Sequence, residues 1–289
     1  MSSVRTAAMG GGGDREFPFS DKHFDYIRNI VTDHAAIRLP DNKRQMVYGR
    51  LVRRLRELNL NSFDEYLQVL EEDNGGPEFV NLINAITTNL TSFFRENHHF
   101  ELLRGRYVPE ILSRHPGKRD LKVWSAGCST GEEPYSISIT LNETLAAKPG
   151  VAAKVLATDI DTKVLETAAT GVYKQDRVNG LPDNVLRRWF QRGRGDNADK
   201  VRVRPEVRNL ITFRQLNLMQ SWPMRGRFDI IFCRNVVIYF DKPTQAKLFN
   251  RYADQLEDGG YLFLGHSETM HNLCDRFTLL GNTVYQKVR

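Results

Sequence analysis

The sequence has few cysteines and no long hydrophobic run. Its 289 residues contain only three cysteines, Cys128, Cys233 and Cys274, which lie far apart and lack the spacing of zinc ligands. We therefore expect free thiols, with no disulfide and no metal site. No stretch approaches the apolar length that spans a bilayer, and residues 1–16 lack the hydrophobic core of a secretion signal. These absences predict a cytoplasmic protein that does not insert into a membrane.

The rest of the composition is that of a globular protein with an excess of positive charge. Hydrophobic residues make up 40% of the chain and charged residues 26%, which suits one large domain and a smaller one. The formal net charge is +6. A basic protein of this kind favours an acidic partner, whether a nucleic acid, an anionic lipid or an acidic protein surface.

The first third of the chain has the pattern of a helical domain. Residues 1–16 form an arm rich in glycine and serine, which we expect to be flexible. Apolar residues then recur at helical spacing up to about residue 90. Ser62 and Glu65 form a capping-box pattern within this stretch. We predict an all-helical N-terminal domain over residues 17–90.

Residues 91–289 have the pattern of an α/β domain. Apolar strands alternate with helical segments from Leu121 onward, which is typical of a parallel, doubly wound sheet. A long insertion at about 172–210 is basic and rich in glycine, and it predicts a small antiparallel ribbon. The expected strands of the main sheet are 121–126, 153–158, 211–217, 228–233, 260–265 and a closing pair within 277–288.

The string WSAGCSTGEEPYS marks a turn between a strand and a helix. Gly127 and Gly131 allow a sharp turn, and the N–H groups that open the next helix face a bound group. Glu132 and Glu133 would repel a pyrophosphate, so a ligand with hydroxyls or a positive charge, such as S-adenosylmethionine, is favoured over a dinucleotide. The alternative is an ordinary turn whose acidic residues favour the helix dipole.

Polar residues follow three of the expected strands. Ligands of doubly wound sheets bind beyond the carboxyl ends of the strands, where Asp159 is placed to accept from ribose hydroxyls. Its alternative role is to cap the helix that begins at Asp161. Asn217, Arg234 and Asn235 follow two other strands. The asparagines suit an adenine edge or a polar ligand tail, although asparagine is also common in turns.

The string TTNLTSFFRE joins the two predicted domains. Arg95 can hold a carboxylate of the ligand or of an acceptor with its planar guanidinium, and its alternative is a surface ion pair with Glu96 or Glu101. Three aromatic side chains suit covering a planar base or the methyl-bearing sulfur of the ligand. Plain core packing is the alternative for each. They are Phe93, Phe94 and Tyr239.

A helix of the N-terminal domain is strongly basic. Between Asp41 and Glu57 lie six basic residues and no acid, namely Lys43, Arg44, Arg50, Arg53, Arg54 and Arg56. Such a face suits an acidic helix or a phosphate backbone. The alternative is a solvated charged surface.

No nucleophile and base stand out as a catalytic pair. His98, His99 and His266 have no spacing that indicates a function. Methyl transfer to a carboxylate would need no base, because a carboxyl group with a pKa of about 4 is already ionised at neutral pH. Catalysis would then consist of positioning the methyl group near the acceptor oxygen and excluding water.

Six strings together resemble the CheR-type chemotaxis receptor methyltransferases, and the resemblance runs from about Ser20 to the end of the chain. It implies transfer of a methyl group from S-adenosylmethionine to glutamate side chains of bacterial chemoreceptors, with S-adenosylhomocysteine as product. It also implies a Rossmann-like methyltransferase domain with an inserted β-subdomain, preceded by a small all-α domain. The strings are KRQMVYGRLVRRLR, TTNLTSFFRE, WSAGCSTGEEPYS, ATDIDTKVLE, FDIIFCRNVVIYFDK and GYLFLGHSE.

The resemblance also implies roles for particular residues. Arg95 and Tyr239 match the pair that the family places near the reactive methyl group. The family's cofactor contacts fall on Asn89, Thr91, Arg95, Glu133, Asp159, Asn217, Leu218, Cys233, Arg234 and Asn235.

Two surfaces are implied for the receptor. The basic helix would face the methylated receptor helices through Arg50, Arg53, Arg54 and Arg56. In part of the family the β-subdomain adds the receptor's C-terminal pentapeptide as an extra strand. The residues of this chain that match such a subdomain are Arg192, Gly193, Gly195 and Arg202.

Two other functions remain open at this stage. The chain could methylate RNA or a small molecule, with the basic face holding phosphate, or it could be a non-catalytic adaptor. The chemoreceptor hypothesis expects no nucleic-acid partner. Nothing in the sequence requires more than a monomer.

Overall fold

The computed structural model describes residues 16–288, so the arm predicted over residues 1–16 lies, apart from Glu16, outside the described residues. The chain forms two compact units. The smaller unit holds the described residues up to Ile30 together with Leu39–Ile86, and the larger holds Val31–Arg38 and the described residues from Thr87 onward. The domain boundary near residue 90 stays a prediction. Within residues 16–288, no helix is long and apolar enough to cross a membrane.

The smaller unit is helical, as its apolar spacing predicts. The capping box is present, because Ser62 Oγ accepts from the Glu65 N–H at 3.1 Å. Glu65 Oε2 reaches back to the Asn61 N–H at 2.8 Å, which satisfies a second backbone donor at this helix start. The helices are α1 (Asp21–Ala35, which continues into the larger unit), α2 (Arg44–Leu58), α3 (Phe63–Asp73) and α4 (Pro77–Ile86).

The larger unit is built on a seven-stranded sheet with the order β6-β2-β1-β7-β8-β10-β9. Strands β6, β2, β1, β7 and β8 are parallel, and β10 is antiparallel to both of its neighbours. The sheet is therefore mixed rather than wholly parallel, because a short hairpin joins the last two strands. The strands are β1 (Asp120–Ala126), β2 (Ala152–Asp159), β6 (Ile211–Gln215), β7 (Phe228–Cys233), β8 (Leu256–Leu264), β9 (Phe277–Gly281) and β10 (Val284–Lys287).

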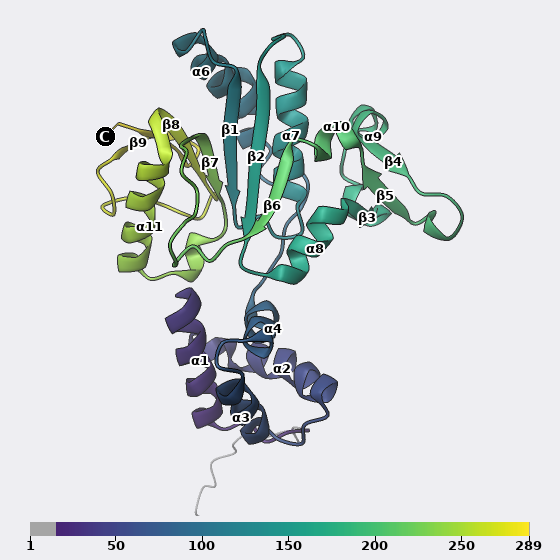
Figure 1. Ribbon diagram of the computed structural model, residues 1–289, viewed down its shortest axis with the longest axis vertical. Coiled ribbons are helices and arrows are strands. Elements are labelled where there is room, and N and C mark those ends of the chain that lie inside the picture. The colour runs from purple at the N-terminus through teal and green to yellow at the C-terminus, as the bar shows by residue number, and fades with distance from the viewer. Residues whose placement is uncertain (1–15, 289) are drawn as a thin grey trace, which may run out of the picture. The chain divides into compact units, whose positions relative to one another are not determined.

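Helices cover both faces of this sheet (Figure 1). Successive side chains of a strand point to opposite faces, so Trp124 packs against α11 while Val123 packs against the helices of the other face. Each large apolar side chain buried in these layers contributes roughly 1.5–3 kcal/mol. The helices are α5 (His98–Leu102), a π-helical turn (Leu103–Tyr107), α6 (Val108–Arg114), α7 (Glu132–Leu145), α8 (Thr162–Thr170) and α11 (Lys242–Gln255).

The predicted insertion forms a small antiparallel sheet with the order β3-β5-β4, which Figure 1 shows beside α8 and α10. Gly193 begins the turn after β4, and a Cβ there would lie 1.9 Å from Asn197 O, so no other residue fits without a backbone shift. Together with the helical unit, this sheet confirms the predicted fold class. The elements are β3 (Val172–Lys174), α9 (Asp183–Trp189), β4 (Phe190–Arg192), β5 (Lys200–Val203) and α10 (Pro205–Arg208).

Candidate functional site

The strand order reverses at β1, since β2 lies on one side of it and β7 on the other. The carboxyl ends of these strands are the usual ligand position in such sheets. The loop after β1 has two glycines with positive φ, Gly127 at 90° and Gly131 at 98°. A Cβ on Gly127 would lie 2.4 Å from Val236 Cγ2, and one on Gly131 would lie 2.9 Å from Ala168 Cβ. Both glycines are therefore required by backbone angle and by space.

Asp159 ends β2 directly beside this loop. Its Oδ2 accepts from the Ser129 N–H at 2.8 Å and its Oδ1 from the Asp161 N–H at 3.0 Å. Burial raises the pKa of Asp159 to about 6, against the lowering effect of the backbone donors. The Ile160 N–H is a third backbone donor to this carboxylate. Because each carboxylate oxygen has two lone pairs, one acceptor position remains. Asp159 does not cap α8, because Asp161 accepts from the Lys163 and Val164 N–H groups.

Asp161 also connects the segment around Asn89 to the loop. Its Oδ2 accepts from Asn89 Nδ2 at 2.7 Å and from Thr87 Oγ1 at 2.9 Å. Ser129 Oγ donates to Asn89 O at 2.9 Å. Asn89 thus lies at the loop after β1, and its contact with the cofactor stays a prediction. The role of Asp161 was not predicted.

Arg234 forms a buried charge cluster at the end of β7. The side chain is 1% exposed, with Nη2 3.1 Å from Glu96 Oε2 and Nη1 3.3 Å from Glu133 Oε2. Nη2 also donates to the backbone oxygen of Arg95. Ser125 Oγ donates to Glu133 at 2.8 Å. Because its guanidinium holds these groups, Arg234 positions the Arg95 segment against the sheet.

The two acids of this cluster differ in pKa. Burial raises the pKa of Glu133, and the attraction of Arg234 only partly opposes it. Burial also acts to raise the pKa of Glu96, but Arg234 and the His266 N–H outweigh it and the pKa is lowered. Glu96 therefore stays ionised beside the guanidinium.

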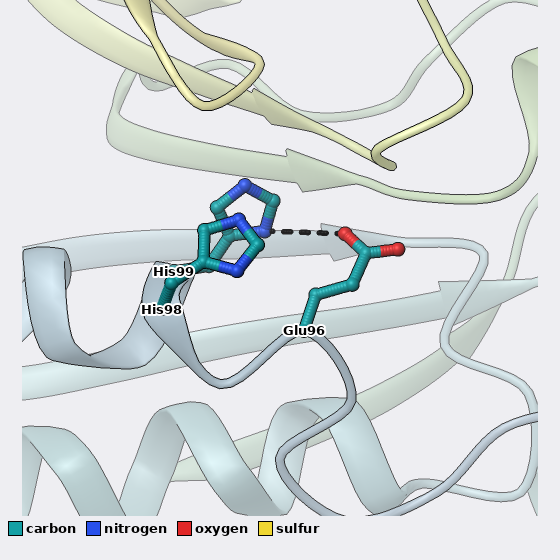
Figure 2. A group of neighbouring side chains, drawn as sticks. All are labelled: Glu96, His98 and His99. Atoms are coloured by element: carbon teal, nitrogen blue, oxygen red, sulfur yellow. Dashed lines mark ion pairs between the residues drawn. The ribbon is translucent and has the colours of Figure 1, made fainter.

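Glu96, His98 and His99 bring a carboxylate and two imidazoles together, with one ligand atom of each within 4.8 Å of the others (Figure 2). The Glu96 carboxylate already pairs with Arg234, whose charge opposes a second cation. His99 Nε2 lies 2.7 Å from Asn282 O. Burial and Arg234 lower the pKa of His99 to about 4. We interpret this group as part of the Arg234 cluster, and the expectation of no metal site stays a prediction.

Arg95 has no ion pair within residues 16–288, so the alternative of a surface pair with Glu96 or Glu101 is wrong for this structure. Its Nη1 donates to Leu90 O at 2.8 Å, and Glu96 pairs with Arg234 instead.

Phe93 packs edge-on against Tyr173 and Phe190, and Phe94 packs against Phe100. Both phenylalanines are therefore packing residues. Tyr239 is half-buried in a short 3₁₀ turn after β7, where its backbone oxygen accepts from the Arg38 N–H at 2.9 Å.

Glu268 organises the turn after β7, although sequence reasoning missed it. Its carboxylate is 4% exposed and accepts from the N–H groups of Asn235 at 2.9 Å, Gly265 at 2.6 Å and Ile238 at 3.3 Å. Asn235 has a positive φ of 59°. Cys233 is fully buried, with Tyr252 Oη 3.1 Å from its Sγ. Only the backbone of Cys233 can face a ligand.

Asn217 lies two residues beyond β6, which ends at Gln215 rather than at the predicted residue 217. Its Nδ2 donates to His34 O at 2.7 Å and its Oδ1 accepts from the Met219 N–H at 2.9 Å. Leu218 is 8% exposed and packs in the core beside Trp124. The asparagine thus fills the turn role that was its alternative, and contact of these two residues with a cofactor stays a prediction.

The β-subdomain supports the same loop. Arg177 Nη2 donates to Thr91 O at 2.9 Å, and Nε donates to Glu132 Oε1 at 3.1 Å. Tyr173 Oη donates to Thr130 O at 2.7 Å. Glu132 is fully buried, and its carboxylate pairs with Arg177. Nothing in the sequence near Arg177 indicated this pairing.

Comparison with known proteins covers both units. The all-α domain of CheR methyltransferases matches residues 22–87, and their SAM-binding domain matches residues 89–286. The chemotaxis protein methyltransferase of Escherichia coli is 48% identical over 92% of this chain and 91% of its own length. Chemotaxis protein methyltransferase 2 of Pseudomonas aeruginosa is 46% identical over 94% of this chain and 95% of its own length. The chemotaxis protein methyltransferase of Borreliella burgdorferi is 36% identical over 83% of this chain and 86% of its own length.

These matches agree with the geometry of the site. The matched SAM-binding domain contains the glycine loop, Asp159 and the Arg234 cluster, and the matched all-α domain is the helical unit. The chain is an enzyme that uses S-adenosylmethionine. It belongs to the family of CheR methyltransferases.

Proposed function

We propose that this protein transfers the methyl group of S-adenosylmethionine to glutamate side chains of chemoreceptors, forming glutamate methyl esters and S-adenosylhomocysteine. The observation that carries the proposal is the match of both family domains, over residues 22–87 and 89–286. A carboxylate oxygen of the acceptor would form the new bond to the methyl group, and the electrons of the broken bond would stay on the sulfur of the product. No base is needed, because the acceptor is ionised at neutral pH.

The residues present suit this cofactor. Asp159 keeps an acceptor position for a ribose hydroxyl, directly beside the glycine loop after β1. Glu133 lies in the first turn of the helix that follows this loop, and we propose that it contacts the cofactor although its carboxylate also pairs with Arg234. When bound, the cofactor supplies the activated methyl group. We propose that Arg95 and Tyr239 position the acceptor carboxylate next to it.

Replacing Asp159 with asparagine should weaken binding of S-adenosylhomocysteine by about 1.5–3 kcal/mol, because the ribose hydroxyls lose a charged acceptor. Calorimetric titration measures the effect. Asp196→Asn changes an exposed acid in the β-subdomain and should leave the affinity unchanged. Equal affinity of Asp159→Asn and the parent would contradict the ribose role.

Cofactor affinity should also fall as the pH drops through about 6, the pKa to which burial raises Asp159. Ribose hydroxyls donate to the ionised carboxylate, so a proton competes with the cofactor and binding below this pH releases one proton. Titrations in buffers of different ionisation enthalpy measure that proton. In Asp159→Asn the affinity for the cofactor should depend less on pH. An unchanged dependence would mean that another group takes up the proton.

The predicted receptor-binding arginines of α2 differ in what they contact within the smaller unit. Arg54 Nε lies 2.7 Å and 3.0 Å from the two carboxylate oxygens of the buried Glu78. Arg50 Nη1 donates to Ile86 O at 2.7 Å, at the end of α4.

Arg56 is exposed and pairs with Glu16. Arg53 is exposed and has no ion pair within residues 16–288. We propose that Arg53 and Arg56 face the receptor, while Arg50 and Arg54 hold the helices together.

Arg53→Glu should therefore depress receptor methylation without changing cofactor affinity or the free energy of unfolding. Arg54→Glu should instead destabilise the protein by about 3–5 kcal/mol, because it leaves Glu78 as an unpaired buried charge. Methylation assays and urea unfolding distinguish the two variants. Parental methylation by Arg53→Glu would contradict receptor docking through this residue.

We further propose that the receptor's C-terminal pentapeptide adds to the small sheet along β4. Strand β5 is central in the order β3-β5-β4, so a new strand can join only β3 or β4. Arg192 and Gly193 lie at the end of β4, and Gly195 has a positive φ of 56° in the following turn. Arg202 lies on β5, where only its exposed side chain can take part. We propose that the enzyme works in the cytoplasm as a monomer.

The proposed reaction is tested by transfer of radiolabelled methyl from S-adenosylmethionine to membranes that contain chemoreceptors. Alkali releases a methyl ester as volatile methanol, so base-labile label on the receptor supports the proposal. Label on RNA that is lost steeply with salt, without label on the receptor, would favour a nucleic-acid substrate. Cofactor binding without any transfer would favour an adaptor.

A further inference from the structure

Two large apolar side chains lie exposed beside the proposed reactive pair. Leu90 is 77% exposed and lies in sequence between two of the predicted cofactor contacts. Ile238 is 51% exposed and directly precedes Tyr239. Single exposed apolar residues are common on protein surfaces. What distinguishes this pair is its position relative to the site.

The site itself holds the backbone of both residues. Leu90 O accepts from Arg95 Nη1 at 2.8 Å, and the preceding carbonyl, of Asn89, accepts from Ser129 Oγ at 2.9 Å. The Ile238 N–H donates to the buried carboxylate of Glu268 at 3.3 Å. The two side chains are therefore presented from fixed backbone.

The same loop connects their positions. The segment of Leu90 contacts the loop after β1 at Ser129. Val236, two residues before Ile238, contacts the loop at Gly127. Leu90 and Ile238 thus belong to two segments that both contact the loop from Gly127 to Gly131, one at Ser129 and the other at Gly127. We propose that this loop binds the cofactor.

We propose that Leu90 and Ile238 contact apolar side chains of the receptor helix on either side of the acceptor glutamate. This inference rests on the proposed function. On a helix, residues three or four positions from the glutamate share its face and lie about 4.5–6 Å from it along the axis. The preferred substrate is then a glutamate flanked on its own face by apolar side chains, and an acidic helix alone is a poor one. The contacts fix the carboxylate before transfer and exclude water from it.

The test is the methylation rate of a receptor cytoplasmic fragment, measured against fragment concentration, for the parent and for Leu90→Ser, Ile238→Ser and the double variant. The double variant should raise KM for the receptor by about tenfold or more, since lost apolar contacts in recognition sites have effects of this size. Affinity for S-adenosylhomocysteine should stay unchanged. Leu90→Met and Ile238→Val should restore the parental KM.

Leu279→Ser is the matched control. Leu279 is 56% exposed on β9, an edge strand of the sheet, and its replacement should change neither KM nor cofactor affinity. A parental KM in the double variant would overturn the inference, as would a KM rise that equals a loss of cofactor affinity. If the parent itself puts no base-labile label on the receptor, the proposed function has failed instead.

Discussion

Replacing Arg95 with lysine is expected to lower the rate of methyl transfer by about 100-fold, the size of effect that follows small misplacement of a reacting group. Arg95 uses Nη1 to hold Leu90 O at 2.8 Å. Within residues 16–288 its Nε and Nη2 have no hydrogen-bond partner, so that edge of the guanidinium is available for a carboxylate in a bidentate geometry. Lysine keeps the charge but supplies a single point contact. Single-turnover measurement of methyl transfer to a receptor fragment gives the rate.

The matched control is Arg104→Lys. Arg104 is half-exposed and pairs with Glu143 at 2.7 Å, away from the loop after β1, and its replacement should leave the rate unchanged. Arg95→Lys should lose more in rate than in cofactor affinity. If Arg95→Lys transferred methyl at the parental rate, Arg95 would not position the acceptor.

Replacing Arg234 with methionine is expected to destabilise the larger unit by about 3–5 kcal/mol, because the buried acids lose their counter-charge. Glu96 and Glu133 lie 3.1 Å and 3.3 Å from the guanidinium, which is 1% exposed. The Arg95 backbone also loses its contact with Arg234, so methyl transfer should fall as well. Urea unfolding measures the free energy of unfolding.

Arg227→Met provides the comparison for a surface ion pair. Arg227 is 51% exposed and lies 3.7 Å from Asp258, and loss of such a pair costs about 1 kcal/mol or less. Arg234→Lys should fall between the parent and Arg234→Met, because it keeps the charge without the planar geometry. Equal unfolding free energies for Arg234→Met and Arg227→Met would show that the cluster does not stabilise the fold.

The elements that local patterns encode were predictable from the sequence. The apolar runs of β1, β2 and β7 and the glycines at 127 and 131 signal a strand, a turn and a helix within a few residues. Asp159 was assigned to the site because it ends an apolar strand. The ribbon formed by β4 and β5 was predicted from alternation and a glycine turn.

The partners of charged residues could not be predicted, because they are distant in sequence. Glu268 accepts from the N–H of Asn235, 33 residues earlier. Arg177 reaches Glu132 across 45 residues, and only the order of strands and helices brings them together. The contacts of the basic residues of α2 could not be distinguished from the sequence either, because all of them belong to one basic run. Arg54 differs from Arg53 because its guanidinium pairs with the buried Glu78.

We propose that the acceptor is a glutamate carboxylate of a chemoreceptor. Mass-spectrometric mapping of a purified receptor cytoplasmic fragment, after incubation with the enzyme and S-adenosylmethionine, tests it most directly. We predict methyl esters on glutamate side chains. They should be removed by mild alkali, absent when those glutamates are replaced with glutamine, and strongly reduced with Arg95→Lys. Methyl groups on other side chains, or an unmodified fragment beside an enzyme that binds the cofactor, would contradict it.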